Sequence, residues 1–233
     1  MVVATGVIKL PELNLGYEGA GIVSRIGPNV KKFRIGDRVL FYGKNTFSSV
    51  ITATEMLFEK IPDELTFTDA STMPMIFVTA IYSLITIGRL EKGQSILIHS
   101  ACGGVGLAAI QIARMVGAEI YTTVGNEEKV AYLMEELKIP RSRIFDSRSS
   151  SFVNDVLRET QGRGVDLALN SLSGELLHAT WRCIAKWGTM VEIGKRDLLG
   201  AAKLDMDVFL ANRNYCCVDV DQMRDERPEV LER

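Results

Sequence analysis

The sequence has 233 residues, enough for one large domain or for a domain of about 150 residues with part of another. Hydrophobic residues make up 47% of the chain and charged residues 24%, which excludes a disordered or fibrous protein. The 27 basic and 29 acidic residues leave a formal net charge of -2 with no basic block, so we expect no nucleic-acid partner.

No apolar run approaches the roughly 18 residues that a membrane span needs, and no secretory signal opens the chain. We therefore expect a cytoplasmic protein that has no membrane partner. The cysteines Cys102, Cys183, Cys216 and Cys217 lack the paired spacing of a zinc site. We interpret the adjacent pair as apolar strand residues.

Residues 17–61 are predicted to form a small β-rich region. Short strand-like segments at 21–24, 36–40 and 49–51 are separated by turn residues. From residue 69 to 84 the apolar residues recur at helical spacing, which predicts a helical linker.

After Gly93 the chain alternates between short apolar runs and amphipathic segments. The runs at 95–99, 119–124, 165–170 and 190–193 are predicted to be strands, and the segments at 104–117, 127–138, 151–160 and 174–185 are predicted to be helices. Strands separated by helices of this length indicate parallel pairing through right-handed crossovers. The sequence thus predicts an α/β fold with an open parallel sheet.

The first of these strands ends at His99 and leads into a turn of small residues. Gly103 would let the backbone approach a pyrophosphate, Gly106 would let the following helix pack closely, and the helix N-terminus would offer N–H groups to phosphate. Ala101 stands where such turns usually have their first glycine. The turn predicts a dinucleotide site, and the alternative is a plain tight connection.

The end of the second strand is expected to select between the two nicotinamide cofactors. An acidic residue there would bind the ribose hydroxyls of NAD and repel a 2′-phosphate. The strand instead ends Thr123-Val124-Gly125-Asn126, and Lys129 follows within one turn. This arrangement favours NADPH, with the alternative that Lys129 is simply a solvated lysine on a helix face.

The sequence resembles the medium-chain dehydrogenase/reductase superfamily and, within it, the enoyl reductase domains of polyketide synthases, especially fungal highly reducing ones, and of fatty acid synthase. The resemblance is carried by 15–23 (LGYEGAGIV), 36–39 (GDRV), 99–108 (HSACGGVGLA), 122–125 (TTVG), 162–166 (GRGVD), 169–175 (LNSLSGE) and 191–195 (VEIGK). It implies a Rossmann doubly wound parallel sheet with a partial GroES-like β-rich domain. We expect the partial substrate-binding domain at 1–68 and the NADPH-binding domain at 69–233, truncated before a return to the substrate domain.

Zinc alcohol dehydrogenases of this superfamily have a metal-binding histidine where this chain has Tyr17. The four-cysteine lobe that holds structural zinc in those relatives is missing as well. The resemblance therefore implies no metal site. Reduction of an activated double bond does not need a Lewis acid, so metal-free hydride addition is the expected chemistry.

The resemblance implies NADPH-dependent reduction of an enoyl thioester that a phosphopantetheine arm carries on an acyl carrier protein. In the family, a lysine after E-I-G and an aspartate further along have been considered as proton donors or organisers of the site. Lys195 matches the lysine, and either Asp219 or Asp221 matches the aspartate. The alternative for Lys195 and Asp219 is a surface ion pair at the sheet edge.

The resemblance also implies a set of cofactor-binding residues in the turn, at the strand ends and in the preceding helix. These are Thr79, Ala101, Gly103, Gly104, Val105, Gly106, Thr123, Lys129, Arg148, Asn170, Ser171 and Gly194. Lys129 and Arg148 match positions near the adenosine 2′-phosphate, which paired cations suit well. His99 is interpreted as a structural residue at a buried strand end.

The first seven residues enter an apolar stretch without a helix cap or turn signal, and residues 228–233 stop inside what resembles a helix start, so we expect segments to be missing on both sides. The expected partners are the carrier protein, other domains of a megasynthase and a second copy paired through the strand near residues 215–220. Two rival functions remain. One is a free-standing quinone or alkenal reductase of the same superfamily, and the other is a nucleotide-binding fragment without catalysis.

Overall fold

A computed structural model describes residues 15–231, which form two compact units. One unit comprises the described residues up to Val78 together with those from Val220 onward, and the other is the continuous segment Thr79–Asp219. This division differs from the predicted domains, whose boundary lay between residues 68 and 69 and whose second range ran to residue 233. Residues 1–14 of the predicted first domain lie outside the described residues.

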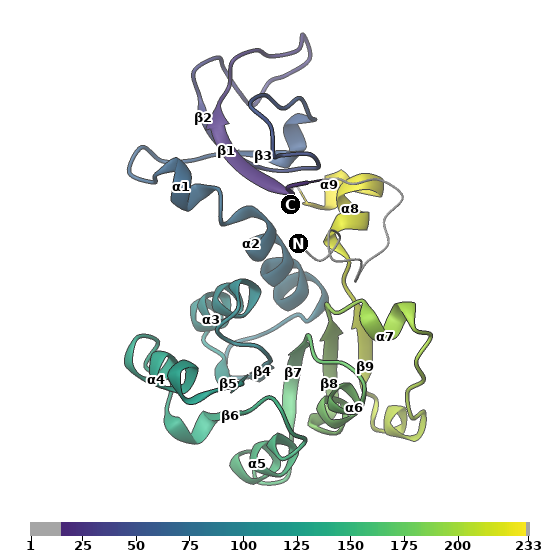
Figure 1. Cartoon of the computed structure of the whole chain (residues 1–233). Helices are drawn as coiled ribbons and strands as arrows, with labels where there is room; N and C mark the ends of the chain where they lie inside the picture. The colour runs from purple at the N-terminus through teal and green to yellow at the C-terminus, as the bar shows by residue number, and fades with distance from the viewer. Residues whose placement is uncertain (1–14, 232–233) are drawn as a thin grey trace. The chain divides into compact units, whose positions relative to one another are not determined.

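The segment Thr79–Asp219 is built on a six-stranded sheet in which every neighbouring pair is parallel (Figure 1). Along the sheet the order is β6-β5-β4-β7-β8-β9. The strands are β4 Ser95–Ile98, β5 Glu119–Val124, β6 Ile144–Asp146, β7 Val165–Asn170, β8 Ile184–Glu192 and β9 Asn214–Cys217. The strand order reverses between β4 and β7, and such a switch point is where doubly wound sheets bind ligands.

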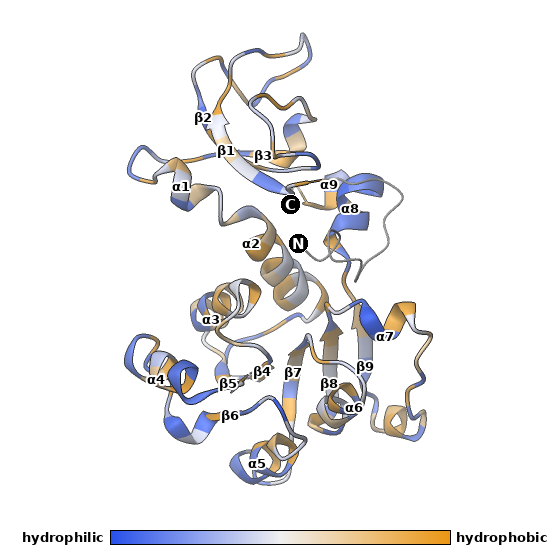
Figure 2. Cartoon of the chain, viewed as in Figure 1, coloured by the Kyte–Doolittle hydropathy of each residue, from blue (hydrophilic) through white to orange (hydrophobic). Residues whose placement is uncertain are grey.

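Four helices that connect the strands of this sheet correspond to the predicted ones: α3 Gly104–Val116, α4 Glu127–Glu135, α5 Phe152–Glu159 and α6 Glu175–Arg182. The short helix α7 Arg196–Leu199 and the 3-10 turns at Arg141–Arg143 and Asp207–Ala211 were not predicted. Figure 2 shows hydrophilic and hydrophobic residues sharing α5, whose buried residues are Phe152 and Val156. One apolar core joins the sheet to the helices, with Trp181 packed against Phe209 and Tyr215. The predicted fold class is confirmed.

The strand β8 begins at Ile184, earlier than the predicted start at residue 190. Its middle carries the exposed Trp187, with a backbone φ of 68°, and Gly188, where an added Cβ would meet backbone oxygens of β7. The pairing of β8 with β7 shifts register at this place. An irregular middle with exposed side chains interrupts the apolar run, so residues 184–185 were predicted as the end of a helix and residues 186–189 as no element.

The other unit contains a three-stranded antiparallel sheet in the order β1-β2-β3. Its elements are β1 Glu18–Ile22, β2 Arg38–Tyr42, a 3-10 turn at Glu55–Leu57, β3 Phe58–Lys60, α1 Phe67–Ala70, α8 Val220–Glu226 and α9 Pro228–Leu231. The predicted strand at 49–51 is not formed. The helix α2 Pro74–Ile81 crosses the division between the units and continues as a π-helix at Tyr82–Ile87, close to the predicted linker.

Side-chain contacts explain why the end of the chain belongs to the antiparallel unit. The Tyr42 hydroxyl on β2 donates a hydrogen bond of 2.7 Å to Asp221 on α8, and Lys44 forms an ion pair with Asp225. Arg224, which is almost fully buried, lies over the rings of Tyr17 and Tyr42. Polar groups on α8 therefore connect the helix to the first strands.

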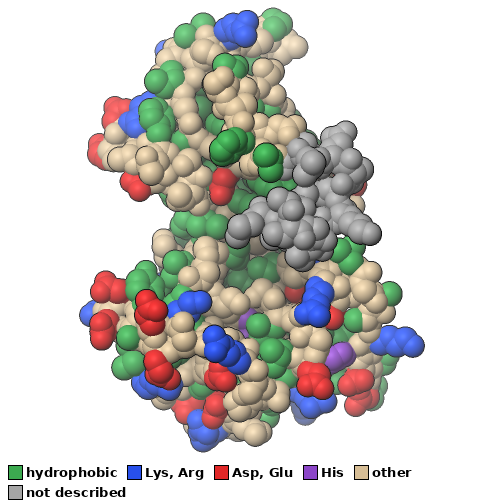
Figure 3. Space-filling view, viewed as in Figure 1, with side chains coloured by type: hydrophobic (Ala, Val, Ile, Leu, Met, Phe, Trp, Pro, Cys, Tyr) green, Lys and Arg blue, Asp and Glu red, His purple; other side chains and the backbone are tan. Residues whose placement is uncertain are grey.

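Basic and acidic side chains are interspersed over the α/β unit on the face shown in Figure 3. In the described part of the chain, no helix combines the length and the apolar character that a membrane crossing requires.

Candidate functional site

The turn between β4 and α3 is shaped by Ser100 rather than by a glycine. Ser100 has a φ of 52°, in the left-handed region, and its carbonyl accepts a 2.8 Å hydrogen bond from the Gly103 amide. Ala101 is fully buried, its φ is not positive, and its amide donates to the Thr123 carbonyl on β5. An alanine in the place of the first glycine therefore causes no backbone strain here.

Gly106 is required by the close approach of α3 to this turn. An added Cβ at Gly106 would lie 2.5 Å from the Ser100 carbonyl oxygen and 2.7 Å from that of Ala101. No side chain caps the helix N-terminus at Gly103, and its first turn holds no acidic residue. The N–H groups of this turn, including Gly104 and Val105, thus suit the phosphates of a dinucleotide.

The end of β5 brings the two predicted phosphate-binding cations into one neighbourhood. The side chain of Arg148 lies over Gly125, where an added Cβ would be 3.2 Å from its Nε. Asn126 caps α4 by accepting a 3.0 Å hydrogen bond from the Lys129 amide. The same first turn also carries Glu127 and Glu128. Cations and carboxylates are therefore both available at this end of the strand.

Thr123, one of the predicted cofactor residues, directs its side chain to His99. Its side chain has no exposed surface, and its hydroxyl lies 2.8 Å from Nδ1 of His99. The Nε2 atom of His99 lies 2.8 Å from the Thr180 hydroxyl, and the ring packs edge-on against Phe152. Burial lowers the pKa of His99 to about 3. The imidazole is thus a neutral, structural group, in agreement with its interpretation from the sequence.

Across the switch point, the loop after β7 meets the glycine turn. Ser171 donates a 3.1 Å hydrogen bond from its hydroxyl to the hydroxyl of Ser100. Asn170, in contrast, is completely buried, and its amide donates to the Leu172 carbonyl and to the Glu192 carboxylate. Of the two predicted cofactor residues, Ser171 therefore borders the turn and Asn170 shapes the loop behind it.

Glu192 is a member of this site that the sequence reasoning missed. Only 1% of the residue is exposed, and its carboxylate also accepts a 2.6 Å hydrogen bond from the Gly194 amide. Burial raises the pKa of Glu192 to about 7. An acidic residue at the end of an otherwise apolar run is the one signal that could have identified it.

Lys195 and Asp219, the lysine and one of the two aspartates that the resemblance singled out, form an ion pair, and their role in proton transfer stays a prediction. Lys195 follows β8 and Asp219 follows β9, so the carboxyl ends of neighbouring strands place them together. The Lys195 ammonium nitrogen lies 2.8 Å from Asp219 Oδ2, and the two side chains are 34% and 29% exposed. Asp221, the other candidate, contacts Tyr42 and Arg224 in the antiparallel unit. The geometry therefore favours Asp219 as the partner of Lys195.

Thr79 is 6% exposed on α2, and its predicted approach to the nicotinamide stays a prediction. A hollow of about 610 Å³ borders the α/β unit between the loops after β6, β7 and β8. It is lined by Arg148, Ser149, Ser150, Ser173, Gly174, Glu175, Leu176, Arg196 and Asp197. Arg148 thus faces a space that could receive part of a nucleotide.

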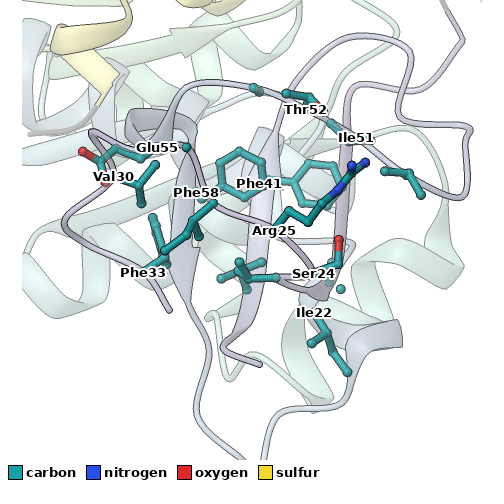
Figure 4. A pocket seen from close by; sticks show the side chains of 18 of the residues that line it. Ile22, Ser24, Arg25, Val30, Phe33, Phe41, Ile51, Thr52, Glu55 and Phe58 are labelled. Atoms are coloured by element: carbon teal, nitrogen blue, oxygen red, sulfur yellow. The ribbon is translucent and has the colours of Figure 1, made fainter. Parts of the chain in front are cut away.

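A second hollow, of about 690 Å³, lies in the antiparallel unit (Figure 4). Phe33, Phe41 and Phe58 contribute aromatic rings to it, together with Arg25 and Glu55. None of the predicted site residues lines this hollow.

Two family models match the chain. The model described as zinc-binding dehydrogenase matches residues 104–232, more than half of the chain, and the model described as alcohol dehydrogenase GroES-like domain matches residues 1–57. Among curated proteins, the highly reducing polyketide synthase sphB of Aspergillus fumigatus is 58% identical over 95% of this chain. The chain spans 9% of the length of that relative.

Solved structures give the same assignment. The crystal structure of CurK enoyl reductase is 31% identical, with a TM-score of 0.83 over 99% of this chain and 68% of that one. The nucleotide-binding subdomain of the enoylreductase domain of PpsC from Mycobacterium tuberculosis is 38% identical, with a TM-score of 0.61 over 67% of this chain and 88% of that one. Likeness to the second structure identifies the α/β unit as a nicotinamide-cofactor-binding domain.

The description of the first family model mentions zinc, but the residues described in this chain do not fit a zinc site. Nowhere between residues 15 and 231 do three His, Cys, Asp or Glu side chains gather in a group that could hold a metal ion. Tyr17 offers no imidazole or thiolate, and Cys102, Cys183, Cys216 and Cys217 are free. No step of the chemistry is therefore derived through a metal.

The sequence resemblance is confirmed by these matches. The glycine turn, the loop at Asn170 and the Lys195–Asp219 pair lie on the elements that the family models and solved structures cover. The chain belongs to the medium-chain dehydrogenase/reductase superfamily and, within it, to the enoyl reductase domains of polyketide synthases.

Proposed function

We propose that this domain catalyses NADPH-dependent reduction of the α,β-double bond of an enoyl thioester carried on an acyl carrier protein, without zinc. The observation that supports it most is that the Lys195–Asp219 pair and the glycine turn both lie at the carboxyl ends of strands of the same parallel sheet. A cation next to a dinucleotide site is what hydride addition to a conjugated thioester requires, because negative charge develops on the thioester as the hydride arrives.

In this proposal the turn at Gly103 to Gly106 holds the pyrophosphate, and Ser171 borders the same cofactor from the neighbouring loop. The cofactor, when bound, supplies the hydride that forms the new C–H bond at the β-carbon. The π electrons of the double bond then reside on the α-carbon and thioester oxygen as an enolate, and a proton at the α-carbon completes the saturated product.

Lys195 serves the enolate in this scheme. Its ammonium group stabilises the negative charge, and it can deliver the proton to the α-carbon and recover one from water. Asp219 holds the ammonium in place through the 2.8 Å ion pair. The electrostatic role of Lys195 does not depend on whether it donates the proton itself.

We further propose that the cofactor is NADPH rather than NADH. Lys129 and Arg148 flank the end of β5, where the adenosine 2′-phosphate would lie. Two cations can neutralise a doubly charged phosphate more fully than either alone. The neighbouring Glu127 and Glu128 make this proposal open to direct measurement, since carboxylates would favour the ribose hydroxyls of NADH.

The proposed setting is a cytoplasmic megasynthase. The partners would be the acyl carrier protein, the other domains of the polypeptide and a second copy of this domain. For the second copy, β9 is an edge strand of the six-stranded sheet within residues 15–231, and its outer backbone groups could pair with the same strand of another copy.

The test offers two substrates to the full-length protein: a crotonyl thioester on carrier protein or pantetheine, and a quinone. Each is supplied with NADPH and, separately, with NADH. We expect NADPH oxidation with the thioester. Oxidation of NADPH with the quinone alone would overturn the proposal in favour of a quinone reductase. Binding of NADPH without its oxidation in the presence of either substrate would indicate a nucleotide-binding domain without catalysis.

A further inference from the structure

Glu192 occupies the point where two loops of the nucleotide unit come together. It is the last residue of β8, and in the parallel register it lies beside Asn170, the last residue of β7. The carboxylate is 1% exposed, which makes it one of the few acidic groups buried in the described chain. Burial of a carboxylate is costly unless hydrogen bonds compensate, so its partners are informative.

The two carboxylate oxygens of Glu192 bind two different loops. Oε2 accepts from the Asn170 side-chain amide, and Oε1 accepts a 2.6 Å hydrogen bond from the Gly194 amide. Asn170 in turn donates to the Leu172 carbonyl and accepts from the Leu172 amide. One carboxylate therefore connects the loop after β7 with the turn after β8, and we name Asn170, Glu192 and Gly194 the carboxylate bridge.

Gly194 of the carboxylate bridge directly precedes Lys195 in the sequence. The amide of Gly194 is held by Glu192. An added Cβ at Gly194 would lie 2.7 Å from Glu192 Oε1, so the turn is folded tightly against the carboxylate. The backbone that carries Lys195 is thus fixed by Glu192, while Asp219 holds only the distal ammonium.

Other charged and titratable groups act on the same carboxylate. Asp197 on α7 disfavours its ionised form, and Tyr215 and Cys217 on β9 interact with its charge. The hydrogen bonds from Asn170 and Gly194 favour the ionised form, but burial outweighs them and raises the pKa of Glu192 to about 7. Ionised Glu192 can accept both bonds, whereas protonation turns one oxygen into a donor.

We propose that Glu192 is a positioning residue: the carboxylate bridge, when ionised, holds the turn that carries Lys195 in the arrangement that serves the enolate. This inference rests on the proposed enoyl reduction and adds to it a residue that does not touch substrate or cofactor. Loss of the bridge should displace Lys195 slightly, and displacements of about 1 Å at a reacting group lower rates by up to a hundredfold.

The test replaces Glu192 in the full-length protein. Glu192→Gln keeps the size of the side chain and one acceptor oxygen. Its amino group, however, faces one of the two N–H donors of Asn170 and Gly194. Glu136→Gln, on the exposed end of α4, is the matched control. Turnover of crotonyl pantetheine at saturating NADPH is measured from pH 6 to pH 9. NADPH binding, followed by cofactor fluorescence, reports separately on the fold of each variant.

We expect Glu192→Gln to lower kcat about tenfold at pH 8.5 and much less at pH 6, where the wild-type bridge is itself protonated. A wild-type to variant ratio that is the same at every pH would assign Glu192 a merely structural role and overturn the inference. An unchanged kcat would overturn it as well.

If Glu192→Gln does not bind NADPH, the turnover of Glu192→Asp tests the inference instead. Its carboxylate keeps the charge but is one methylene too short to reach both partners, so kcat should fall while the loss of activity at low pH remains. A wild-type rate for Glu192→Asp would overturn the inference. Failure of the proposed function gives a different result, since the wild-type protein itself would then oxidise no NADPH with the thioester.

Discussion

Two buried titratable side chains lie at the carboxyl edge of the same sheet and respond to protons in opposite ways. His99, after β4, has its pKa lowered to about 3, and Glu192, at the end of β8, has its pKa raised to about 7. Burial is the first cause of both shifts, because it disfavours the charged form of either group. Only Glu192 therefore changes its charge near neutral pH.

This difference in pKa distinguishes the two functions proposed for the site, which are cofactor binding and proton transfer. The half that contains Ser100, Gly106 and His99 includes a histidine that stays neutral at neutral pH, which suits the binding of a pyrophosphate diester whose own charge is constant there. The half that contains Glu192 and Lys195 can respond to protons, which suits a step that ends with a proton transfer. Four measurements test whether the phosphate half, with Ser100, Gly106 and His99, differs in this way from the proton half, with Glu192 and Lys195.

The largest expected effect concerns His99 and acid. Its pKa is lower in the folded chain than the ordinary 6.5, so its contribution to stability is complete above pH 6.5 and is lost as the pH falls toward 3. The full span corresponds to roughly 5 kcal/mol. His99→Gln should therefore make the free energy of unfolding, measured with urea at pH 7 and pH 4, less sensitive to acid. Equal acid sensitivity of the two proteins would contradict this account.

The next effect concerns turnover. Lys195→Ala removes the cation that stabilises the enolate, and we expect kcat to fall about a hundredfold. The dissociation constant for NADPH should change little, because Lys195 lies in the proton half of the site. Stopped-flow turnover and equilibrium binding measure the two quantities. If turnover and NADPH affinity were lowered equally, Lys195 would be assigned to cofactor binding, and the two halves of the site would not differ in function.

A smaller effect tests the phosphate half. Lys129→Ala should raise the KM for NADPH about tenfold, the worth of one charge-assisted hydrogen bond, while leaving the KM for NADH unchanged. Arg148→Ala should act in the same direction. Lys138→Ala, beyond the end of α4, serves as the control. An unchanged ratio of the two KM values would remove both residues from the 2′-phosphate site.

The smallest effect separates the two candidate aspartates. Asp219→Asn should lower turnover about fivefold, since the ammonium of Lys195 is kept but loses its ionic partner. Asp221→Asn should instead lower the melting temperature more than the rate, because the buried Arg224 loses a carboxylate. Calorimetry and turnover on the same samples check both. The reverse pattern, in which Asp221→Asn lowers turnover and Asp219→Asn lowers the melting temperature, would assign Asp221 instead of Asp219 to the half of the site that responds to protons.

The sequence predicted the parts of the molecule that depend on local pattern. Alternating runs and glycine spacing located β4, β5, β7 and the turn, because strand period and turn chemistry are written in neighbouring residues. They did not locate the first half of β8, where Trp187 and Gly188 interrupt the apolar run. Nor did they exclude a strand at residues 49–51, since a short apolar run is compatible with irregular backbone.

The predicted site residues also differed in whether the local sequence was enough to place them. Lys195 was named from its motif, but choosing between Asp219 and Asp221 required knowing which strand ends next to β8. Thr123 and Asn170 were expected at the cofactor, yet their side chains are buried and bind His99 and Glu192. Such pairings join residues far apart in the sequence, so no local pattern contains them.

The hydrogen bond between Tyr42 and Asp221 joins residues that are 179 positions apart. Between them lies the whole segment Thr79–Asp219, which contains its own sheet and core. On a ribosome, the antiparallel unit would emerge first but could not acquire α8 until the entire nucleotide unit had been synthesised. All parts of the α/β unit are therefore present once Asp219 has been synthesised, whereas the contacts between α8 and the first strands become available only afterwards.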